Sequence, residues 1–169
     1  MRRLALLTAL LLAVLAAPAW AAKSHRVDVP RTLAKQIAAA KQQTDVPILL
    51  PSRLIAERKK LYGAGAGEAG GYGFSLAAIR RCGGANACTV AYFTAERGAE
   101  PSFTDSIALA NGITGYFKGL TCGASCSPPL IEWVQDGVLY TIQADAGTRR
   151  AERRRIVALA NSAIRNGPR

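Results

Sequence analysis

The sequence is poor in the residues on which most hydrolytic enzymes depend. Histidine occurs once among 169 residues, at His25, and the nucleophile pattern Gly-x-Ser-x-Gly is absent. Because serine and cysteine hydrolases use an imidazole to activate the nucleophile, this shortage argues against an enzyme of that kind. Glu132 and Asp136 could act as a carboxylate pair, but four residues of extended strand separate them by roughly 13 Å, beyond the usual glycosidase spacing.

Long apolar runs are also missing after the first residues. The run Leu4–Ala17 follows two arginines and precedes Ala19-Trp20-Ala21, an A-x-A cleavage site. It is shorter than the roughly 20 apolar residues that span a bilayer, which favours a bacterial secretory signal, residues 1–21, over a membrane anchor. No cysteine follows it, so we expect no lipid anchor. The mature protein is predicted to be periplasmic or secreted, with no membrane span.

Acidic residues are scarce relative to basic ones. Lysine and arginine number 22 against 11 aspartates and glutamates, which gives a formal net charge of +11. Removing Arg2 and Arg3 with the signal leaves +9. Such a charge favours anionic partners in the envelope, such as phosphates, acidic glycans or acidic proteins; it also fits solubility alone. Nucleic acid is not expected in an exported protein, and the charge does not predict an oligomeric state.

The mature chain divides into residues 22–45, a leader and helix, and residues 46–169, one α+β domain. Residues 23–29 are predicted to be a loose leader, and residues 30–43 a helix. The apolar stretch 46–54 contains two prolines and is typical of an edge strand or an extended segment. Residues 57–73 are predicted to form a flexible connector. Residues 65–70 fit the pattern Gly-x-Gly-x-x-Gly of dinucleotide-binding loops. They follow no predicted strand, so they do not indicate a dinucleotide site.

Three hairpins are expected in the rest of the domain. Residues 72–78 and 90–93 alternate as two strands around the loop CGGANAC. Residues 106–117 turn at Asn111-Gly112, and residues 131–142 turn at Asp136-Gly137; both pairs suit positive φ angles. The hairpins predict an antiparallel β-meander.

A C-terminal helix completes the predicted fold. Ile156, Leu159, Ala160, Ala163 and Ile164 fall on one helical face. Thr148 is a suitable N-cap residue, and Gly167 a suitable stop. This apolar stripe should pack on one face of the sheet, which places the fold in the α+β class.

The four cysteines have three possible pairings. An even number in an oxidising compartment favours two disulfides, and we favour Cys82–Cys88 and Cys122–Cys126 because each closes a local ring. A redox centre prefers C-x-x-C at a helix start, which CGASC does not match. Zinc would need all four thiolates together, or histidine, so we expect no metal and no cofactor.

Two groups of side chains are candidate binding sites. Arg149, Arg150, Arg153 and Arg154 crowd the start of the last helix, where positive charge opposes the helix dipole. An anion there would offset that cost; a solvated face, partly neutralised by Glu152, is the alternative. The second group consists of aromatic residues of the sheet, which are either exposed for binding or packed in the core: Tyr116, Trp133 and Tyr140.

Several short stretches carry a resemblance. LLPSRL, CGGANAC, LANGITGYF, CGASCSPPLIEW, GVLYTI and LANSAI, in this order, resemble a group of uncharacterised exported bacterial proteins. The part from NGITGYF through W-x-x-x-G-x-x-Y-x-I to the closing helix is similar to small extracytoplasmic domains attached to some anti-sigma factors. The second resemblance implies a sensing or binding role in the envelope. Neither brings catalytic residues.

Two functions follow as hypotheses. The first is an exported, non-catalytic envelope domain that binds a protein or an anionic glycan through the arginines or the aromatic residues. The second is a small secreted hydrolase whose carboxylates meet only in the folded chain. A concave pocket with convergent carboxylates would favour the enzyme, and a basic or aromatic surface would favour the binding domain.

Overall fold

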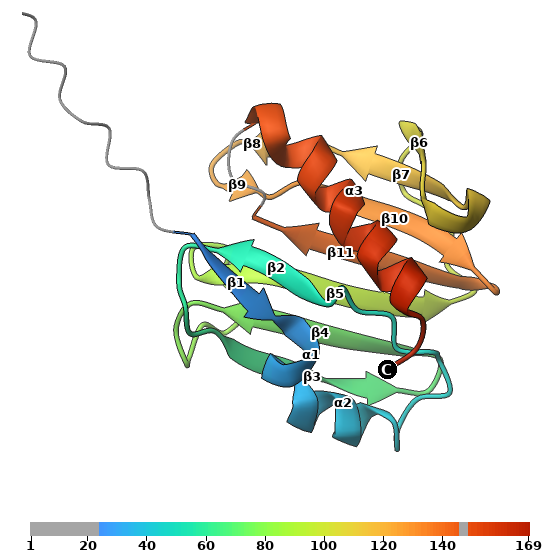
Figure 1. Ribbon diagram of the computed structural model, residues 1–169, viewed down its shortest axis with the longest axis horizontal. Coiled ribbons are helices and arrows are strands. Elements are labelled where there is room, and N and C mark those ends of the chain that lie inside the picture. The colour runs from blue at the N-terminus through green and yellow to red at the C-terminus, as the bar shows by residue number, and fades with distance from the viewer. Residues whose placement is uncertain (1–23, 146–148) are drawn as a thin grey trace, which may run out of the picture.

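The computed structural model describes residues 24–145 and 149–169 and confirms the α+β class (Figure 1). A seven-stranded antiparallel sheet carries helix α3 and the paired strands β1 and β2 on one face. The predicted signal, residues 1–21, lies outside the described residues. The elements are β1 (His25–Asp28), α1 (Val29–Thr32), α2 (Ala34–Ala40), β2 (Arg53–Ala56), β3 (Tyr62–Glu68), β4 (Gly71–Ala77), β5 (Thr89–Arg97), β6 (Ser106–Ala108), η1 (Ala110–Gly112), β7 (Thr114–Lys118), β8 (Thr121–Cys122), β9 (Cys126–Ser127), β10 (Leu130–Gln135), β11 (Val138–Ala144) and α3 (Arg149–Asn166).

The three predicted hairpins are present, but they do not lie side by side in chain order. Strands β4 and β5, β6 and β7, and β10 and β11 each pair antiparallel. Asn111 (φ 59°) and Asp136 (φ 54°) have the positive φ angles expected of their turns. The sheet order is β3-β4-β5-β11-β10-β7-β6, so β11, β10 and β7 lie between β5 and β6. Residues 98–105 therefore carry the chain to the far edge, which is a departure from a simple meander.

The predicted flexible connector, residues 57–73, is wrong for most of its length. Residues 62–68 form strand β3, which pairs with β4 along its whole length. Alternate glycines make this possible, because Gly63 and Gly67 lie within close contact of Thr32, Leu33 and Ala40 around α2 and leave no room for side chains. Helix α2 thus packs directly on β3.

Side-chain amides of the α2 region also bond to the backbone of β3. Gln36 Nε2 donates to the carbonyl of Gly63 at 3.0 Å, and the N–H of Gly67 donates to Gln43 Oε1 at 3.2 Å. Strand β3 is an edge strand, and unpaired backbone groups of an edge strand can pair with another chain. The two side-chain bonds satisfy some of these groups. The prediction missed β3 because glycine is disfavoured in strands, and the compensating helix is not visible locally.

The predicted loose leader is also wrong for the described residues. Residues 25–28 form β1, which pairs antiparallel with β2 and buries Val27. Asp28 then caps α1 by accepting a hydrogen bond from the N–H of Arg31 at 2.9 Å. The predicted helix over residues 30–43 is present as α1 and α2, with a break at Leu33 (φ −98°, ψ 12°).

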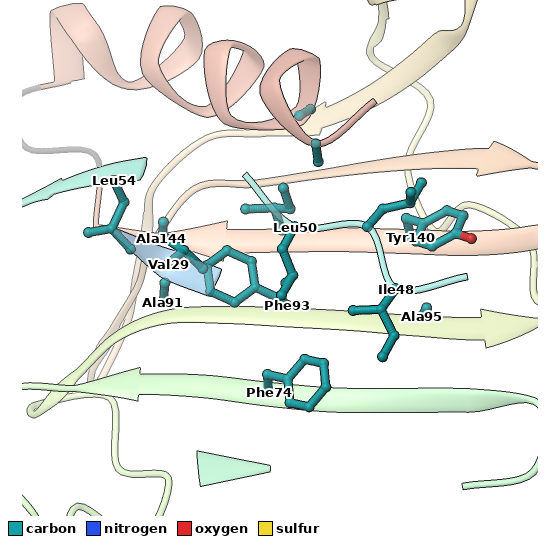
Figure 2. Close-up of a cluster of buried hydrophobic side chains, with 14 of the residues drawn as sticks. Val29, Ile48, Leu50, Leu54, Phe74, Ala91, Phe93, Ala95, Tyr140 and Ala144 are labelled. Carbon is teal, nitrogen blue, oxygen red and sulfur yellow. The ribbon is translucent and has the colours of Figure 1, made fainter. Parts of the chain in front are cut away.

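Residues 46–50 form an extended, buried segment held by tyrosine hydroxyls. The Tyr72 hydroxyl donates to the carbonyl of Leu49 at 3.0 Å and accepts from its N–H at 3.1 Å. The Tyr140 hydroxyl donates to the carbonyl of Pro47 at 3.1 Å. In Figure 2, Ile48 and Leu50 lie over the sheet residues Phe74 and Phe93. Of the stretch 46–54, expected as an edge strand or an extended segment, residues 46–50 thus pack on the core outside any strand, and residues 53–54 begin β2. Side chains satisfy backbone groups that a sheet ladder would otherwise bond.

Helix α3 covers the sheet as predicted. Ile156, Ala160 and Ala163 are fully buried, and Leu159 is half-buried. Asn161 Oδ1 accepts a hydrogen bond from the N–H of Ala110 at 2.6 Å, which ties the helix to the turn between β6 and β7. Gly167 (φ 66°) ends the helix as expected. The predicted N-cap, Thr148, lies outside the described residues.

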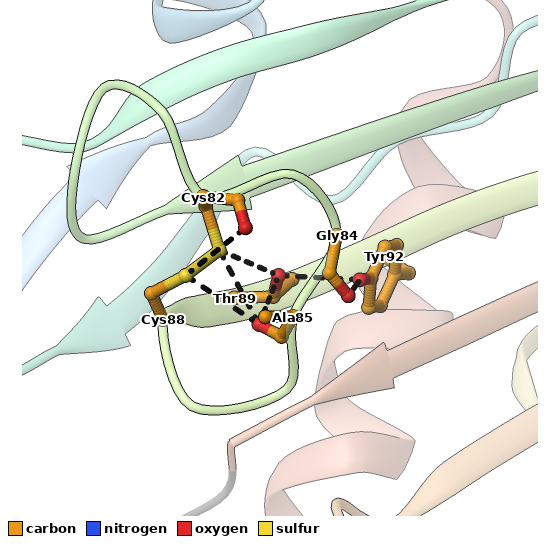
Figure 3. Close-up of a disulfide and its surroundings, with 6 residues drawn as sticks. All are labelled: Cys82, Gly84, Ala85, Cys88, Thr89 and Tyr92. Atoms are coloured by element: carbon orange, nitrogen blue, oxygen red, sulfur yellow. Dashed lines mark hydrogen bonds between the residues drawn. A yellow bond between two sulfur atoms is a disulfide. The ribbon is translucent and has the colours of Figure 1, made fainter.

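Both predicted disulfides are present, Cys82–Cys88 in the β4–β5 loop and Cys122–Cys126 between β8 and β9. The first loop is also held by hydrogen bonds (Figure 3): the Tyr92 hydroxyl donates to the carbonyl of Gly84 at 2.6 Å. Two disulfides agree with an oxidising compartment. Among residues 24–145 and 149–169, no helix is long and apolar enough to cross a membrane.

Replacing Cys82 and Cys88 by serine is expected to lower the free energy of unfolding by about 2 kcal/mol, because the ring restricts the unfolded chain. Urea unfolding of variant and parent measures the change. In the parent, alkylation before reduction should label no thiol at these positions. Labelling of the folded, unreduced protein would contradict the pairing.

Candidate binding groove

Arg153, Arg154 and Arg155 at the start of α3 have different surroundings. Arg153 makes an ion pair with Asp105 at 3.1 Å, and its guanidinium lies 5.1 Å from the ring centroid of Phe117. Arg154 is exposed, whereas Arg155 lines a groove beside β2. Successive helix positions point about 100° apart, which separates these side chains. The side chains of Arg149 and Arg150 lie outside the described part of the structure. The anion site of Arg149, Arg150, Arg153 and Arg154 therefore stays a prediction.

Two of the three candidate aromatic residues are not on the surface. Trp133 is 0% exposed and Tyr140 is 2% exposed. Their rings stack at 5.4 Å between centroids on the covered face of the sheet, where they form part of the core. Of the two alternatives for these residues, packing in the core is therefore the one that holds for Trp133 and Tyr140. Tyr116 lies on the opposite face and is half-buried.

The carboxylates considered for catalysis have other positions. Glu132 is buried, and its Oε2 accepts a hydrogen bond from the N–H of Ser102 at 2.7 Å. That bond fastens the crossing segment 98–105 to β10. Asp136 is exposed in the β10–β11 turn. Neither residue lines the groove described below.

The first part of the groove lies between the β1–β2 pair, the end of β11 and α3. Its volume is about 310 Å³, and its wall is mainly apolar. Three arginines and one aspartate surround the apolar wall, which leaves an excess of positive charge. The lining residues are Arg26, Arg53, Leu54, Ile55, Ala144, Asp145, Arg155, Ala158 and Leu159.

A second part continues from the first toward the Cys82–Cys88 loop. It has a volume of about 540 Å³ and shares Ile55, Asp145 and Arg155 with the first part. Glu57 and Asp145 are its two carboxylates, and both are exposed.

Pairing of β1 with β2 is what assembles the basic rim. Arg26 lies opposite Ile55, and Arg53 lies opposite Asp28, on the exposed side of the pair. Arg26 and Arg53 are not among the predicted site residues, because the sequence predicts a loose leader where β1 forms. The alternation Arg26-Val27-Asp28-Val29 was the available signal, since period-two alternation indicates a half-buried strand.

In the described part of the chain, no group of three or more histidine, cysteine, aspartate or glutamate side chains is placed to hold a metal ion. Comparisons with protein-family models, curated proteins and solved structures found no match. The resemblance to exported bacterial proteins and to domains attached to anti-sigma factors stays a prediction.

Proposed function

We propose that this protein is an exported, non-catalytic envelope domain that binds a segment of another protein carrying both apolar and acidic side chains. The observation behind the proposal is the groove between β2 and α3, where an apolar wall is bordered by Arg26, Arg53 and Arg155. An apolar wall contributes to binding by burial of apolar surface, and arginine recognises carboxylates by paired hydrogen bonds.

The chemistry of the wall favours a protein segment over an anionic glycan. The side chains of Leu54, Ala158 and Leu159 contain no donor or acceptor that could form hydrogen bonds with sugar hydroxyls. Aliphatic side chains of a partner would bury this surface, and neighbouring carboxylates would reach the arginines. The exposed side of Ile55, which is 49% accessible, would be covered in the same contact.

The test uses a synthetic peptide probe that alternates leucine with aspartate and glutamate, and a second probe, polygalacturonate. Binding is followed by amide chemical shifts of the labelled protein. We expect the peptide to shift residues of β1, β2 and α3. Arg26→Gln with Arg53→Gln should weaken peptide binding about tenfold or more, because two charge-assisted contacts are removed.

A matched variant, Arg31→Gln with Arg165→Gln, removes the same charge from exposed positions that do not line the groove. It should bind the peptide as the parent does. Equal weakening by both variants would show general charge attraction and contradict the groove. Preference for polygalacturonate, unaffected by Leu159→Ser, would favour a glycan instead.

A further inference from the structure

A second basic surface lies at the end of the sheet where β3 begins and β4 ends. Arg58, Lys59 and Lys60 lead into β3, and Arg80 and Arg81 follow β4. Pairing of the two strands, with Tyr62 opposite Ala77, brings the two segments together. We call this surface the basic end and define it by these five cations and Ile79.

Contacts with one tyrosine ring show that the two segments meet. The ring centroid of Tyr62 lies 5.5 Å from Lys60 Nζ and 5.4 Å from Arg80 Cζ. All five cations are exposed, and none makes a salt bridge within residues 24–145 and 149–169. Only Glu57 contributes an acidic side chain from the segments 57–61 and 78–88. The basic end therefore has a strong excess of positive charge.

Ile79 adds an apolar side chain in the middle of this charge. It is 49% exposed and directly precedes Arg80 and Arg81. The Cys82–Cys88 ring follows at once and fixes the course of the chain (Figure 3). The N–H of Ala78 donates to the carbonyl of Cys88 at 2.8 Å, which anchors the segment on its other side. Ile79 is thus presented by a restrained loop.

We propose that the basic end docks on the surface of a membrane that contains anionic phospholipids. Lysine and arginine near such a surface gain from its negative potential, and an apolar side chain gains by entering the boundary between headgroups and acyl chains. Gathered cations without acidic partners repel one another, and lipid phosphates would relieve that repulsion. A soluble polyanion would use the cations but would leave Ile79 without a role. Of the residues of the basic end, only Arg58 also lines the second part of the groove, and the variants that test the proposal leave Arg58 unchanged.

Co-sedimentation with vesicles tests the proposal. The protein is purified after export and its N-terminus is sequenced, because an uncleaved signal would itself bind lipid. Vesicles contain one part phosphatidylglycerol to three parts phosphatidylcholine, or phosphatidylcholine alone. We expect binding to the first kind only. The variant Lys59→Gln, Lys60→Gln, Arg80→Gln, Arg81→Gln should bind at least about 100-fold more weakly, since each cation near the surface changes partitioning about fivefold.

Two further variants separate a membrane from other polyanions. Ile79→Ser keeps every charge and should lower vesicle binding about fivefold or more, because its side chain no longer enters the lipid. It should leave binding to soluble heparin unchanged. Loss of four exposed cations elsewhere, by Arg31→Gln, Lys35→Gln, Lys41→Gln and Arg165→Gln, should have little effect by comparison.

Three results would overturn the proposal: equal binding to neutral vesicles, equal losses in the two four-fold variants, or vesicle binding by Ile79→Ser at the parent level. Lys59→Arg with Lys60→Arg keeps the charge and should retain binding, which guards against a simple folding defect. The groove variant Arg26→Gln with Arg53→Gln loses two charges but keeps the basic end. Its vesicle binding should fall far less than that of the four-fold variant, so the two proposals can fail separately.

Discussion

Replacing Gly65 by alanine is expected to lower the free energy of unfolding by at least about 3 kcal/mol, because the position is incompatible with any side chain. Gly65 has φ 129°, a conformation that residues with a Cβ rarely adopt. A Cβ there would also lie 2.1 Å from the carbonyl oxygen of Gly73 and 2.7 Å from the Cα of Phe74. Both obstacles are backbone atoms of the neighbouring strand, so the sheet itself would have to move. Urea unfolding measures the loss.

Gly73→Ala is the matched control. Gly73 lies next to Gly65 across the β3–β4 pair, but a Cβ at Gly73 would meet nothing within 4 Å. Alanine there restricts the unfolded chain without straining the fold, so stability should change by less than about 1 kcal/mol, toward higher stability. If Gly65→Ala were as stable as Gly73→Ala, residues 62–68 would behave as the flexible connector expected from sequence, and strand β3 would be contradicted.

Local signals were sufficient for several parts of the fold. The Asn111-Gly112 and Asp136-Gly137 turns are set by the backbone freedom of those residues, and both have the expected positive φ. The two disulfides close short rings, so spacing in the chain already favoured them. The stripe at Ile156 and Ala160 follows the helical period and needed only a sheet to cover.

Elements that depend on distant partners could not be found in this way. Strand β3 exists because Gly63 and Gly67 admit α2, whose residues lie more than twenty positions earlier. Strand β1 depends on β2, and the insertion of β11 next to β5 depends on pairing across residues 98–137. Such pairings depend on the packing of the whole sheet. The sequence of one segment therefore does not show which strand will pair with it.

Dependence on distant partners also explains which arginines the structure brings together in the groove. At the start of α3, Arg153 is paired with Asp105, whereas Arg155 lines the groove. Arg26 and Arg53, which are distant in sequence, come to one groove because β1 and β2 pair. Trp133 and Tyr140 follow the ordinary preference of aromatic rings for the core. At the groove, strand pairing brings together arginines that are far apart in the sequence.

Stability is expected to fall steeply as the pH rises above about 10, because two core tyrosines resist ionisation in the folded protein. Burial, with a smaller effect of Asp136, raises the pKa of Tyr140 to about 12, against an opposing effect of Arg97. Burial raises the pKa of Tyr72 well above its usual value, although its hydrogen bond with Leu49 acts in the other direction. Both hydroxyls hold the segment 46–50, so their ionisation would also break those contacts.

Stability decreases with rising pH because the unfolded chain releases its tyrosine protons at a lower pH than the folded protein does. A tyrosine in the unfolded chain ionises near its ordinary pKa of about 10, whereas the folded protein raises the pKa of Tyr140 to about 12 and that of Tyr72 well above its usual value. The stabilisation is complete below pH 10 and decreases as the pH rises, by about 1.4 kcal/mol per pH unit for each tyrosine. Over the two units this loss is comparable with the whole stability of a small domain, so alkaline unfolding is expected near pH 12.

Urea unfolding at a series of pH values, with tyrosinate absorbance followed in parallel, measures this dependence. Tyr140→Phe should lose the hydrogen bond to Pro47 and be less stable near neutral pH, yet show a smaller decline above pH 10. Tyr116→Phe is the control for loss of a tyrosine hydroxyl away from the segment 46–50, because Tyr116 lies on the opposite face of the sheet. A decline of equal slope in the parent and Tyr140→Phe would mean that Tyr140 ionises alike in the folded and unfolded chains, and the role of its buried hydroxyl in the pH dependence would be refuted.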